Sequence, residues 1–274
     1  MLNARAQCLD IASVLPPASR MFEPNKEAYH AFVKEGYKRM EKSRAVICGL
    51  ARTLGDKLDN TIELVEATGQ KFSDYGVVIF ENDSADDTAA KLKEWASLSP
   101  RVDVHSQKLG TKHWPATREL GRMADLAAYR NHCRKRALEL FADYDYVIVA
   151  DTDLFGWSID GIANSIGHND WDFMGSVSWA KGKLGNWVHY DVWAFRNPDY
   201  MPLTARQVNP WLPRLGDPVV PVKSCFGGLG VYRMDAYKSA CYAGTDCEHV
   251  CLHQGMAQAG FDRQFINPSQ ITIY

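Results

Sequence analysis

Hydrophobic and polar positions in the first half of the chain follow two alternating periods. Short segments of apolar or β-branched residues predict buried strands at residues 45–51, 76–80, 102–104 and 146–150. Between them, apolar side chains recur at helical spacing and predict helices over residues 56–68, 87–97 and 123–141. Strands that alternate with helices are typical of a doubly wound, mostly parallel α/β sheet, which is the fold class that we expect.

The second half of the chain has a different pattern, rich in tryptophan, glycine and proline. Residues 209–213 read Asn-Pro-Trp-Leu-Pro, and further tryptophans stand at Trp171, Trp179, Trp187 and Trp193. This pattern predicts mixed strands joined by long loops, and such loops often carry function.

The N-terminal residues 1–43 predict a helical arm that is interrupted at Pro16 and Pro17. No internal repeat or linker follows the arm. Residues 44–274 are therefore expected to form one domain in two parts, about 44–153 and about 154–274. A chain of 274 residues is long enough to bury a core without disulfide or metal support.

The charge of the chain argues against two classes of partner. Its net charge is −2, so it has no basic surface of the kind that binds nucleic acid or an anionic membrane. No apolar run approaches the roughly 20 residues needed to cross a bilayer. The first residues also lack the continuous apolar core of a signal peptide. We expect a cytoplasmic protein without a transmembrane segment, and peripheral membrane association stays open.

The chain has seven cysteines, an odd number, and no Cys-x-x-Cys pair. Most lie in apolar runs, which predicts reduced, buried thiols rather than disulfides. Cys247 and Cys251 lie close to His249 and His253, which suggests zinc. A structural zinc site usually takes paired ligands from two separate segments, and only one such segment exists, so we do not expect zinc.

Carboxylates follow two of the predicted strands, at the sheet edge where ligands of open α/β sheets bind. Asp151-Thr152-Asp153 comes directly after the strand 146–150. If this segment is extended, its alternate side chains point to one side. Two such oxygen ligands suit Mg²⁺ or Mn²⁺. An isolated Asp-x-Asp is usually a solvated turn, but its position after a buried central strand favours a metal site.

The second acidic strand end contains Glu81 and Asp83, after the strand 76–80. Ser84 or Asp86 can cap the helix that begins near residue 87. Asp83 lies nearer the strand and is expected to be free to hydrogen-bond a ligand ring.

Three motifs of this chain resemble glycosyltransferase family 2. They are residues 81–88 (Glu-Asn-Asp-Ser-Ala-Asp-Asp-Thr), residues 226–233 (Phe-Gly-Gly-Leu-Gly-Val-Tyr-Arg) and residues 248–252 (Glu-His-Val-Cys-Leu). In that family they correspond to the nucleotide-binding strand end, the glycine-rich acceptor strand and the segment that supplies the catalytic base. The chain departs from the family at His249, where the family usually has the aspartate that often serves as base.

A second resemblance covers more of the middle and the end. Residues 126–131, 144–147, 190–196, 221–228 and 247–253 resemble the fungal capsule-associated alpha-1,3-mannosyltransferase family (family 69). That family often lacks the first aspartate of the Asp-x-Asp, which this chain keeps as Asp151. Family 2 inverts the anomeric configuration and family 69 retains it, so the resemblance leaves the stereochemical outcome open.

Both resemblances imply a GT-A fold and a metal-dependent glycosyltransferase. The part 44–153 would bind a nucleoside-diphosphate sugar, with GDP-mannose favoured and a UDP-sugar second. The part 154–274 would bind a glycan or another hydroxyl acceptor. A hexose, mannose by preference, would pass between them with Mn²⁺ or Mg²⁺ as cofactor.

The resemblances also suggest which residues form the site. The expected donor-binding residues are Arg52, Glu81, Asp83, Arg130, Asp151, Gly227 and Gly228. The expected metal ligands are Asp151, Asp153 and one histidine, His253 or His249. Arg130 would donate a charged hydrogen bond to the diphosphate, and Gly227-Gly228 would let the substrate approach the backbone.

Three residues are candidates for the chemical step. Glu248 is the favoured base, although an acid at the start of a helix is also explained by the helix dipole. His249 is the alternative base. Asp191 would hydrogen-bond sugar hydroxyl groups, with Trp193 or Trp179 stacked on a sugar face.

Two other functions fit part of the pattern. A sugar-phosphate nucleotidyltransferase shares the sheet and the acidic metal ligands, but it usually has a glycine-rich basic loop after the first strand. Residues 49–55 are not rich enough in glycine for such a loop. A non-catalytic sugar-binding module would not need the Asp-x-Asp or Glu248.

Overall fold

The computed structural model describes residue 15 and residues 20–182, 185–201 and 214–274. Two features discussed above lie outside the described residues: the prolines expected to interrupt the arm, and the run 209–213 with its tryptophan.

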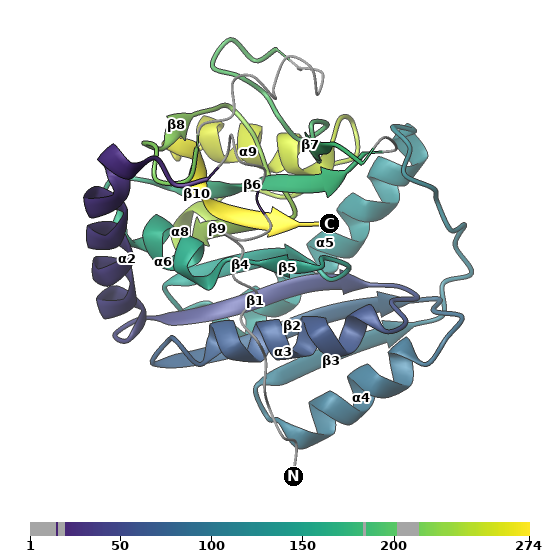
Figure 1. Cartoon of the computed structure of the whole chain (residues 1–274). Coiled ribbons are helices and arrows are strands. Elements are labelled where there is room, and N and C mark those ends of the chain that lie inside the picture. The colour runs from purple at the N-terminus through teal and green to yellow at the C-terminus, as the bar shows by residue number, and fades with distance from the viewer. Residues whose placement is uncertain (1–14, 16–19, 183–184, 202–213) are drawn as a thin grey trace.

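One mixed sheet runs through the described part of the chain, with strand order β3-β2-β1-β4-β9-β6-β10-β5 (Figure 1). Two short strands lie off this path, where β7 pairs with β6 and β8 with β10. The strands are β1 (Arg44–Ala51), β2 (Asp74–Asn82), β3 (Val102–Gln107), β4 (Tyr146–Asp151), β5 (Gly156–Trp157), β6 (Phe173–Lys181), β7 (Trp187–His189), β8 (Val220–Pro221), β9 (Leu229–Arg233) and β10 (Gln264–Ile273).

The first four of these strands form the parallel half that the sequence predicts. Strand β1 pairs in parallel with β2 and with β4, and β2 pairs in parallel with β3. Strand β9 then runs antiparallel to both β4 and β6. The prediction of a mostly parallel sheet with a mixed second half is confirmed.

The helices cover both faces of this sheet. They are η2 (Glu23–Asn25), α2 (Lys26–Met40), α3 (Lys57–Gly69), α4 (Thr88–Leu98), α5 (Leu120–Phe141), α6 (Ile159–Gly167), α8 (Met234–Lys238) and α9 (Glu248–Gln258). The three helices predicted from apolar spacing match α3, α4 and α5, with no end shifted by more than three residues.

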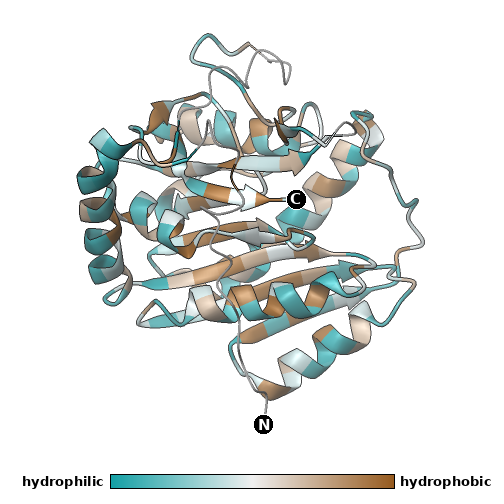
Figure 2. Cartoon of the chain, viewed as in Figure 1, coloured by the Kyte–Doolittle hydropathy of each residue, from teal (hydrophilic) through white to brown (hydrophobic). Residues whose placement is uncertain are grey.

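Two hydrophobic clusters hold the layers together, one on each face. In β1, Val46 and Cys48 belong to the cluster under α5 and α9, whereas Ala45 and Ile47 belong to the cluster under α3, α4 and α6. This division follows the two-residue period of a strand that is buried on both sides. Figure 2 shows the apolar colour concentrated along the strands and the polar colour on the outer faces of the helices.

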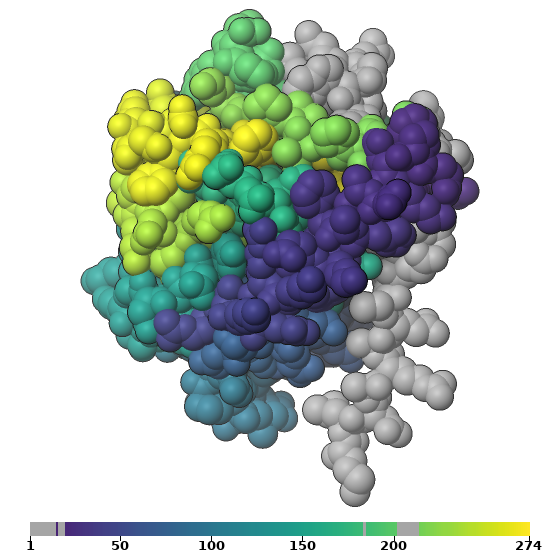
Figure 3. All heavy atoms as spheres, turned by 90° about the vertical axis from the view of Figure 1, so that its left-hand side faces the viewer, coloured from purple at the N-terminus to yellow at the C-terminus, as the bar shows by residue number. Residues whose placement is uncertain are grey.

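Helix α2, the described part of the expected arm, packs directly on the domain (Figure 3). A Cβ atom at Gly36 would lie 1.7 Å from the carbonyl oxygen of Ala163 in α6, so only glycine permits this approach. Arg39 Nη1 donates to the carbonyl oxygens of Ile166, at 3.1 Å, and His168, at 2.8 Å. Met40 is fully buried. The domain boundary at residue 43 stays a prediction, but α2 belongs to the packed body.

Four of the described cysteines are buried free thiols, as predicted: Cys48, Cys133, Cys225 and Cys247. The prediction is wrong for Cys241, which is exposed because it follows α8 in a surface loop. Within the described ranges, no helix is both long enough and apolar enough to cross a membrane.

Candidate active site

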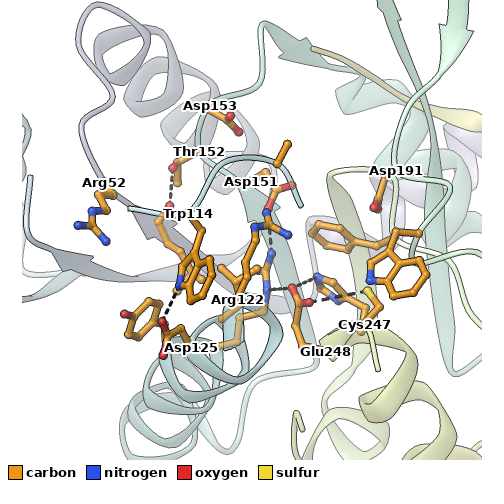
Figure 4. A pocket seen from close by; sticks show the side chains of 18 of the residues that line it. Arg52, Trp114, Arg122, Asp125, Asp151, Thr152, Asp153, Asp191, Cys247 and Glu248 are labelled. Atoms are coloured by element: carbon orange, nitrogen blue, oxygen red, sulfur yellow. Dashed lines mark hydrogen bonds and ion pairs between the residues drawn. The ribbon is translucent and has the colours of Figure 1, made fainter. Parts of the chain in front are cut away.

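A cavity of about 660 Å³ lies at the carboxyl ends of β1 and β4. Its walls come from the residues after these two strands, from the first turns of α5, from residues 189–193 and from the start of α9. This is the sheet edge where the sequence places a ligand site. Its volume suits a ligand of nucleotide-sugar size. Figure 4 shows the side chains that line it.

The Asp-x-Asp segment ends the central strand β4 in a turn. Asp151 is the last residue of β4, whereas Thr152 and Asp153 lie in the turn. The segment is therefore not extended, and the condition under which both carboxylates would point to one side of a strand is not met. The turn is fixed by a hydrogen bond of 2.6 Å from the Thr61 hydroxyl to the Thr152 carbonyl oxygen. In Figure 4, Asp151 lies close to the side chains around Glu248, whereas Asp153 lies farther from them.

Asp151 is held by two side chains from distant parts of the chain. Arg130 Nη2 donates to its Oδ1 at 2.9 Å, and the Tyr274 hydroxyl donates to its Oδ2 at 2.7 Å. Arg130 Nε also donates to Glu248 Oε1 at 3.0 Å. Arg130, which is 6% exposed, thus pairs with two carboxylates, and Glu248 is itself 4% exposed. This arrangement orients both acids and lowers the cost of burying them.

Asp153 carries the less constrained carboxylate. Its side chain is solvent-accessible and forms no ion pair with any described residue. The atoms crowded around it, followed by the negative charge of Asp151, raise its pKa. A cation would relieve this repulsion. Mg²⁺ and Mn²⁺ often bind through one or two carboxylates, with the other positions filled by water and phosphate oxygens. Asp153 and Asp151 therefore fit a divalent cation that arrives with a diphosphate, although no group of three His, Cys, Asp or Glu suited to a metal occurs among the described residues.

The two histidines of α9 have different environments. His253 is fully buried, with Nδ1 2.8 Å from the Ser224 hydroxyl and Nε2 3.0 Å from the Tyr232 hydroxyl. It does not line the cavity, and both of its nitrogens have partners away from Asp153. The expected metal role therefore does not fit.

His249 does line the cavity. It is 2% exposed and stacks on Phe226, with ring centroids 3.7 Å apart. Neither of its ring nitrogens has a hydrogen-bond partner. Burial, and then the positive charge of Arg130, lower the pKa of His249 well below its usual value, so the ring is neutral.

The acidic side chains at the end of β2, Glu81 and Asp83, hold loops next to the pocket wall. Glu81 Oε1 accepts from the Ser84 amide at 2.9 Å, and its other oxygen accepts from the Ser106 hydroxyl. Asp83 accepts from the backbone amides of Leu109 at 2.8 Å and Gly110 at 2.9 Å. Neither acid lines the cavity. This geometry gives no support to their expected donor contacts. The oxygens of Asp83 hold the loop after β3, and those of Glu81 contact Ser84 after β2 and Ser106 within β3.

The hydrogen bonds from that loop, led by the amide of Gly110, hold the pKa of Asp83 well below its usual range. Arg52 lines the cavity and donates to the carbonyl oxygens of Thr111 at 2.8 Å and Lys112 at 3.2 Å. Arg52 therefore stays at the pocket wall, and its expected contact with a nucleotide stays a prediction.

The prediction that Ser84 or Asp86 caps α4 is wrong, because the N-cap of α4 is Asp87, which makes no side-chain cap hydrogen bond. Asp86 Oδ1 accepts from the amide of Thr88, the first residue of α4, at 3.0 Å. Asp86 Oδ2 accepts from the Gly55 amide at 2.8 Å, and the Ser84 hydroxyl accepts from the Thr53 amide at 2.9 Å. These contacts tie the loops after β1 and β2 to each other.

Gly227 and Gly228 face the protein rather than the cavity. Both have positive φ angles, 65° and 76°. A Cβ atom at Gly227 would lie 2.1 Å from the Ser176 carbonyl oxygen, and one at Gly228 would lie 2.6 Å from the Tyr274 hydroxyl. Their expected contact with the donor does not fit. The missing side chain at Gly228 instead allows Tyr274 to reach Asp151.

Asp191 lines the cavity from the loop after β7. Its φ angle is 53°, and its Oδ2 accepts from the Gly227 amide at 2.9 Å. Trp193 also lines the cavity, and its indole nitrogen has no hydrogen-bond partner. Trp179 is 5% exposed and lies in the core, so the expected stacking of a sugar on Trp179 does not fit.

No protein-family model matches the chain, and no curated protein matches it in sequence. Solved structures do match the fold. Mannosyltransferase PcManGT from Pyrobaculum calidifontis, in complex with GDP-Man and Mn²⁺, matches with a TM-score of 0.52 at 12% identity. The match covers 92% of this chain and 67% of that chain. GalNAc-T7 with UDP, GalNAc and Mn²⁺ matches with a TM-score of 0.53 at 14% identity, over 95% of this chain and 53% of its own. The chain has the GT-A fold. It spans about half the length of the second structure.

Sequence reasoning missed part of the GT-A pocket. Arg122, Asp125 and Tyr129 line it from one face of α5, at the spacing of three or four residues that brings helical side chains together. Arg118 also lines it, with its guanidinium 4.5 Å from the centre of the Trp193 ring. Neither Arg118 nor Arg122 has a carboxylate partner in the described part of the chain. The helical spacing was the signal that would have identified Arg122.

Proposed function

We propose that this protein is a metal-dependent glycosyltransferase that moves a hexose from a nucleoside-diphosphate sugar to a hydroxyl group of a glycan or another acceptor. The observation that carries the proposal is the meeting of Asp151, Asp153, Arg130 and Glu248 in one cavity at the end of β4. A diphosphate needs positive charge around it, which a divalent cation at Asp151 and Asp153 would supply, while Arg130 and Glu248 hold Asp151 in place.

The donor side of the cavity is the side with Asp153, Arg52 and Trp114 (Figure 4). Mn²⁺ or Mg²⁺ bound by Asp153 and Asp151 would neutralise the charge that develops on the leaving diphosphate. Arg122, which has no carboxylate partner among the described residues, would donate charged hydrogen bonds to the same group. Arg52 and Trp114 would then lie beside the ribose and base.

The choice of donor rests on resemblance. The motifs similar to the fungal mannosyltransferase family favour GDP-mannose, and a UDP-sugar is the second candidate. A fold similar to a mannosyltransferase solved with GDP-Man and to an enzyme solved with UDP is compatible with either.

Glu248 has a different place from the one expected for a free base. Its Oε1 accepts from Arg130 at 3.0 Å, and its Oε2 lies 3.7 Å from the Cys247 thiol. The carboxylate is thus committed to contacts inside the protein. We assign Glu248 the task of positioning Arg130, and through it Asp151.

Calorimetry with GDP-mannose and a set of UDP-sugars, with and without Mn²⁺, tests the donor. Release of nucleoside diphosphate and transfer to a panel of methyl glycosides test the reaction. A nucleotidyltransferase would instead make a nucleotide sugar and pyrophosphate from a nucleoside triphosphate and a sugar phosphate. A binding module would bind sugar without turnover. Either result would overturn the proposed function.

A further inference from the structure

The wall of the cavity opposite Arg52 and Trp114 carries a carboxylate that is not tied to a cation. Asp191 forms no ion pair with any described residue. Its Oδ2 accepts from the Gly227 amide, and its Oδ1 has no hydrogen-bond partner in the described ranges. Figure 4 shows Asp191 on the same side of the view as Cys247 and Glu248, away from Arg52. Asp191 is therefore available to a ligand, whereas Glu248 is not.

Two residues of the same wall, Trp193 and His249, carry buried nitrogen atoms without a hydrogen-bond partner. They are the Trp193 indole nitrogen and both His249 ring nitrogens, and His249 Nε2 lies 3.7 Å from Glu248 Oε1. Burying such groups without a partner is unfavourable, so most buried polar groups have a hydrogen-bond partner in the protein or an ordered water. A neutral imidazole offers one donor and one acceptor, and the indole offers one donor. This combination suits a molecule with several hydroxyl groups.

The backbone of Asp191 also points to function. A φ of 53° is uncommon outside glycine, although aspartate and asparagine adopt it more readily than most residues. The conformation is held from the other side by the Gly227 amide, and Gly227 itself has no room for a side chain. Such backbone angles cluster at functional sites.

Burial raises the pKa of Asp191 to about 7, and the negative charge of Asp151 contributes next. A carboxylate with a pKa near the working pH is well matched to accept a proton. The charged and titratable groups that act on Asp191 or are acted on by it are Asp151, Glu248, Arg130, Tyr190, Cys225, Cys247 and Tyr274.

We propose that Asp191 is the proton acceptor of an inverting sugar transfer, and that the hydroxyl-bearing acceptor lies beside it against the wall that Trp193 and His249 help to form. This inference rests on the proposed function and refines it. The acceptor oxygen attacks the anomeric carbon while the bond from that carbon to the diphosphate oxygen breaks. The acceptor proton passes to Asp191 Oδ1, and the bonding electron pair leaves with the nucleoside diphosphate.

The test compares Asp191→Asn with the wild-type protein, using GDP-mannose, Mn²⁺ and methyl α-mannoside as the acceptor probe, and UDP-sugars if GDP-mannose is not used. Asparagine keeps the shape and tolerates the positive φ, so the variant is expected to fold. We expect kcat to fall about 10²–10⁴-fold, the usual effect of losing a general base. Calorimetric binding of GDP should change less than about twofold, because Asp191 lies away from Arg52 and the donor side of the cavity. Asp191→Glu should recover part of the loss.

The pH profile separates a chemical role from a structural one. Wild-type kcat/KM should decrease as the pH is lowered through an apparent pKa near 7. The profile of Asp191→Asn should lack this decrease on the acid side. Glu248→Gln, which changes a neighbouring carboxylate, should keep it. Asp235→Asn, at an exposed side chain of α8 that does not line the cavity, is the control for an unrelated loss of charge. If Asp191→Asn does not fold, the wild-type and Glu248→Gln profiles decide alone.

The outcomes are distinguishable. Absence of transfer by the wild-type protein with every donor would overturn the proposed function, and this inference with it. Transfer that survives Asp191→Asn at wild-type kcat would overturn only the role of Asp191. A product with retained anomeric configuration, or a wild-type profile without the decrease on the acid side, would also overturn it.

Discussion

The shared guanidinium of Arg130 gives the sharpest prediction about the framework of the site. Arg130→Met keeps a long side chain against Phe226, whose ring centre lies 5.1 Å from the guanidinium carbon, but removes the positive charge. Glu248, which is 4% exposed, would then be buried without a cation. Removing one partner of a buried ion pair costs about 3–5 kcal/mol. Since a domain is typically stable by about 5–15 kcal/mol, the variant should lose a large share of its stability.

Urea unfolding followed by circular dichroism measures this loss. The matched control is Arg136→Met in the same helix, where Arg136 is 39% exposed and pairs with Asp103 at 2.8 Å. An exposed pair is worth about 0–1 kcal/mol, so the control should unfold nearly as the wild type does.

A double variant isolates the charge effect. Arg130→Met combined with Glu248→Gln removes the unpaired charge and should recover about 1–3 kcal/mol relative to the sum of the two single losses. The reasoning would be refuted if Arg130→Met cost no more than Arg136→Met, or if the two single losses simply added.

Three further predictions test other parts of the site. Asp153→Ala should stay folded but lose Mn²⁺-dependent nucleotide binding and at least about 100-fold in turnover, because the ion loses its least constrained ligand; full activity of this variant in EDTA would contradict the metal site. Gly227→Ala should destabilise the protein by about 2–5 kcal/mol in urea unfolding, since it combines a positive φ with a Cβ atom 2.1 Å from the Ser176 carbonyl oxygen; a stable variant would argue against that backbone path. Burial lowers the pKa of His253 to about 3, so below pH 6.5 the unfolded chain binds a proton that the native state does not, and the associated stability is lost as the pH falls. His253→Gln should therefore make the free energy of unfolding about 2 kcal/mol less dependent on pH between 7 and 5, and an unchanged dependence would rule out a neutral native His253.

Much of the fold could be read from local pattern. The strand at 146–150 and the helix at 123–141 each follow from spacing along a continuous segment, because burial on one or both sides imposes a fixed period. The same reasoning placed Asp151 and Asp153 at the end of a central strand, where sheet topology puts ligands. The helix ends differed by a few residues, since end positions depend on neighbouring loops as well as on spacing.

The sequence pattern does not predict whether a carboxylate at a strand end contacts a ligand or another part of the protein. Asp83 follows a strand just as Asp151 does, yet its oxygens accept amide hydrogens from residues 109–111. A donor in a loop about 26 residues away has no signature in the sequence around Asp83. Tertiary placement of that loop decided that Asp83 supports the wall instead of facing the cavity.

The sequence by itself determined the element types, the parallel half of the sheet and the acidic strand end, because each depends on residues near one another in the chain. Only the tertiary structure decided which acidic side chain is bound to other protein groups and which keeps an oxygen without a protein partner. Arg130 and Glu248 lie 118 residues apart, and their contact ties Glu248 into the framework. Asp191 and Gly227 lie 36 residues apart, and the hydrogen bond between them uses one oxygen of Asp191. The other oxygen of this cavity-lining residue is left without a hydrogen-bond partner among the described residues. The availability of a side chain depends on the partners that packing brings to it, and those partners come from remote segments.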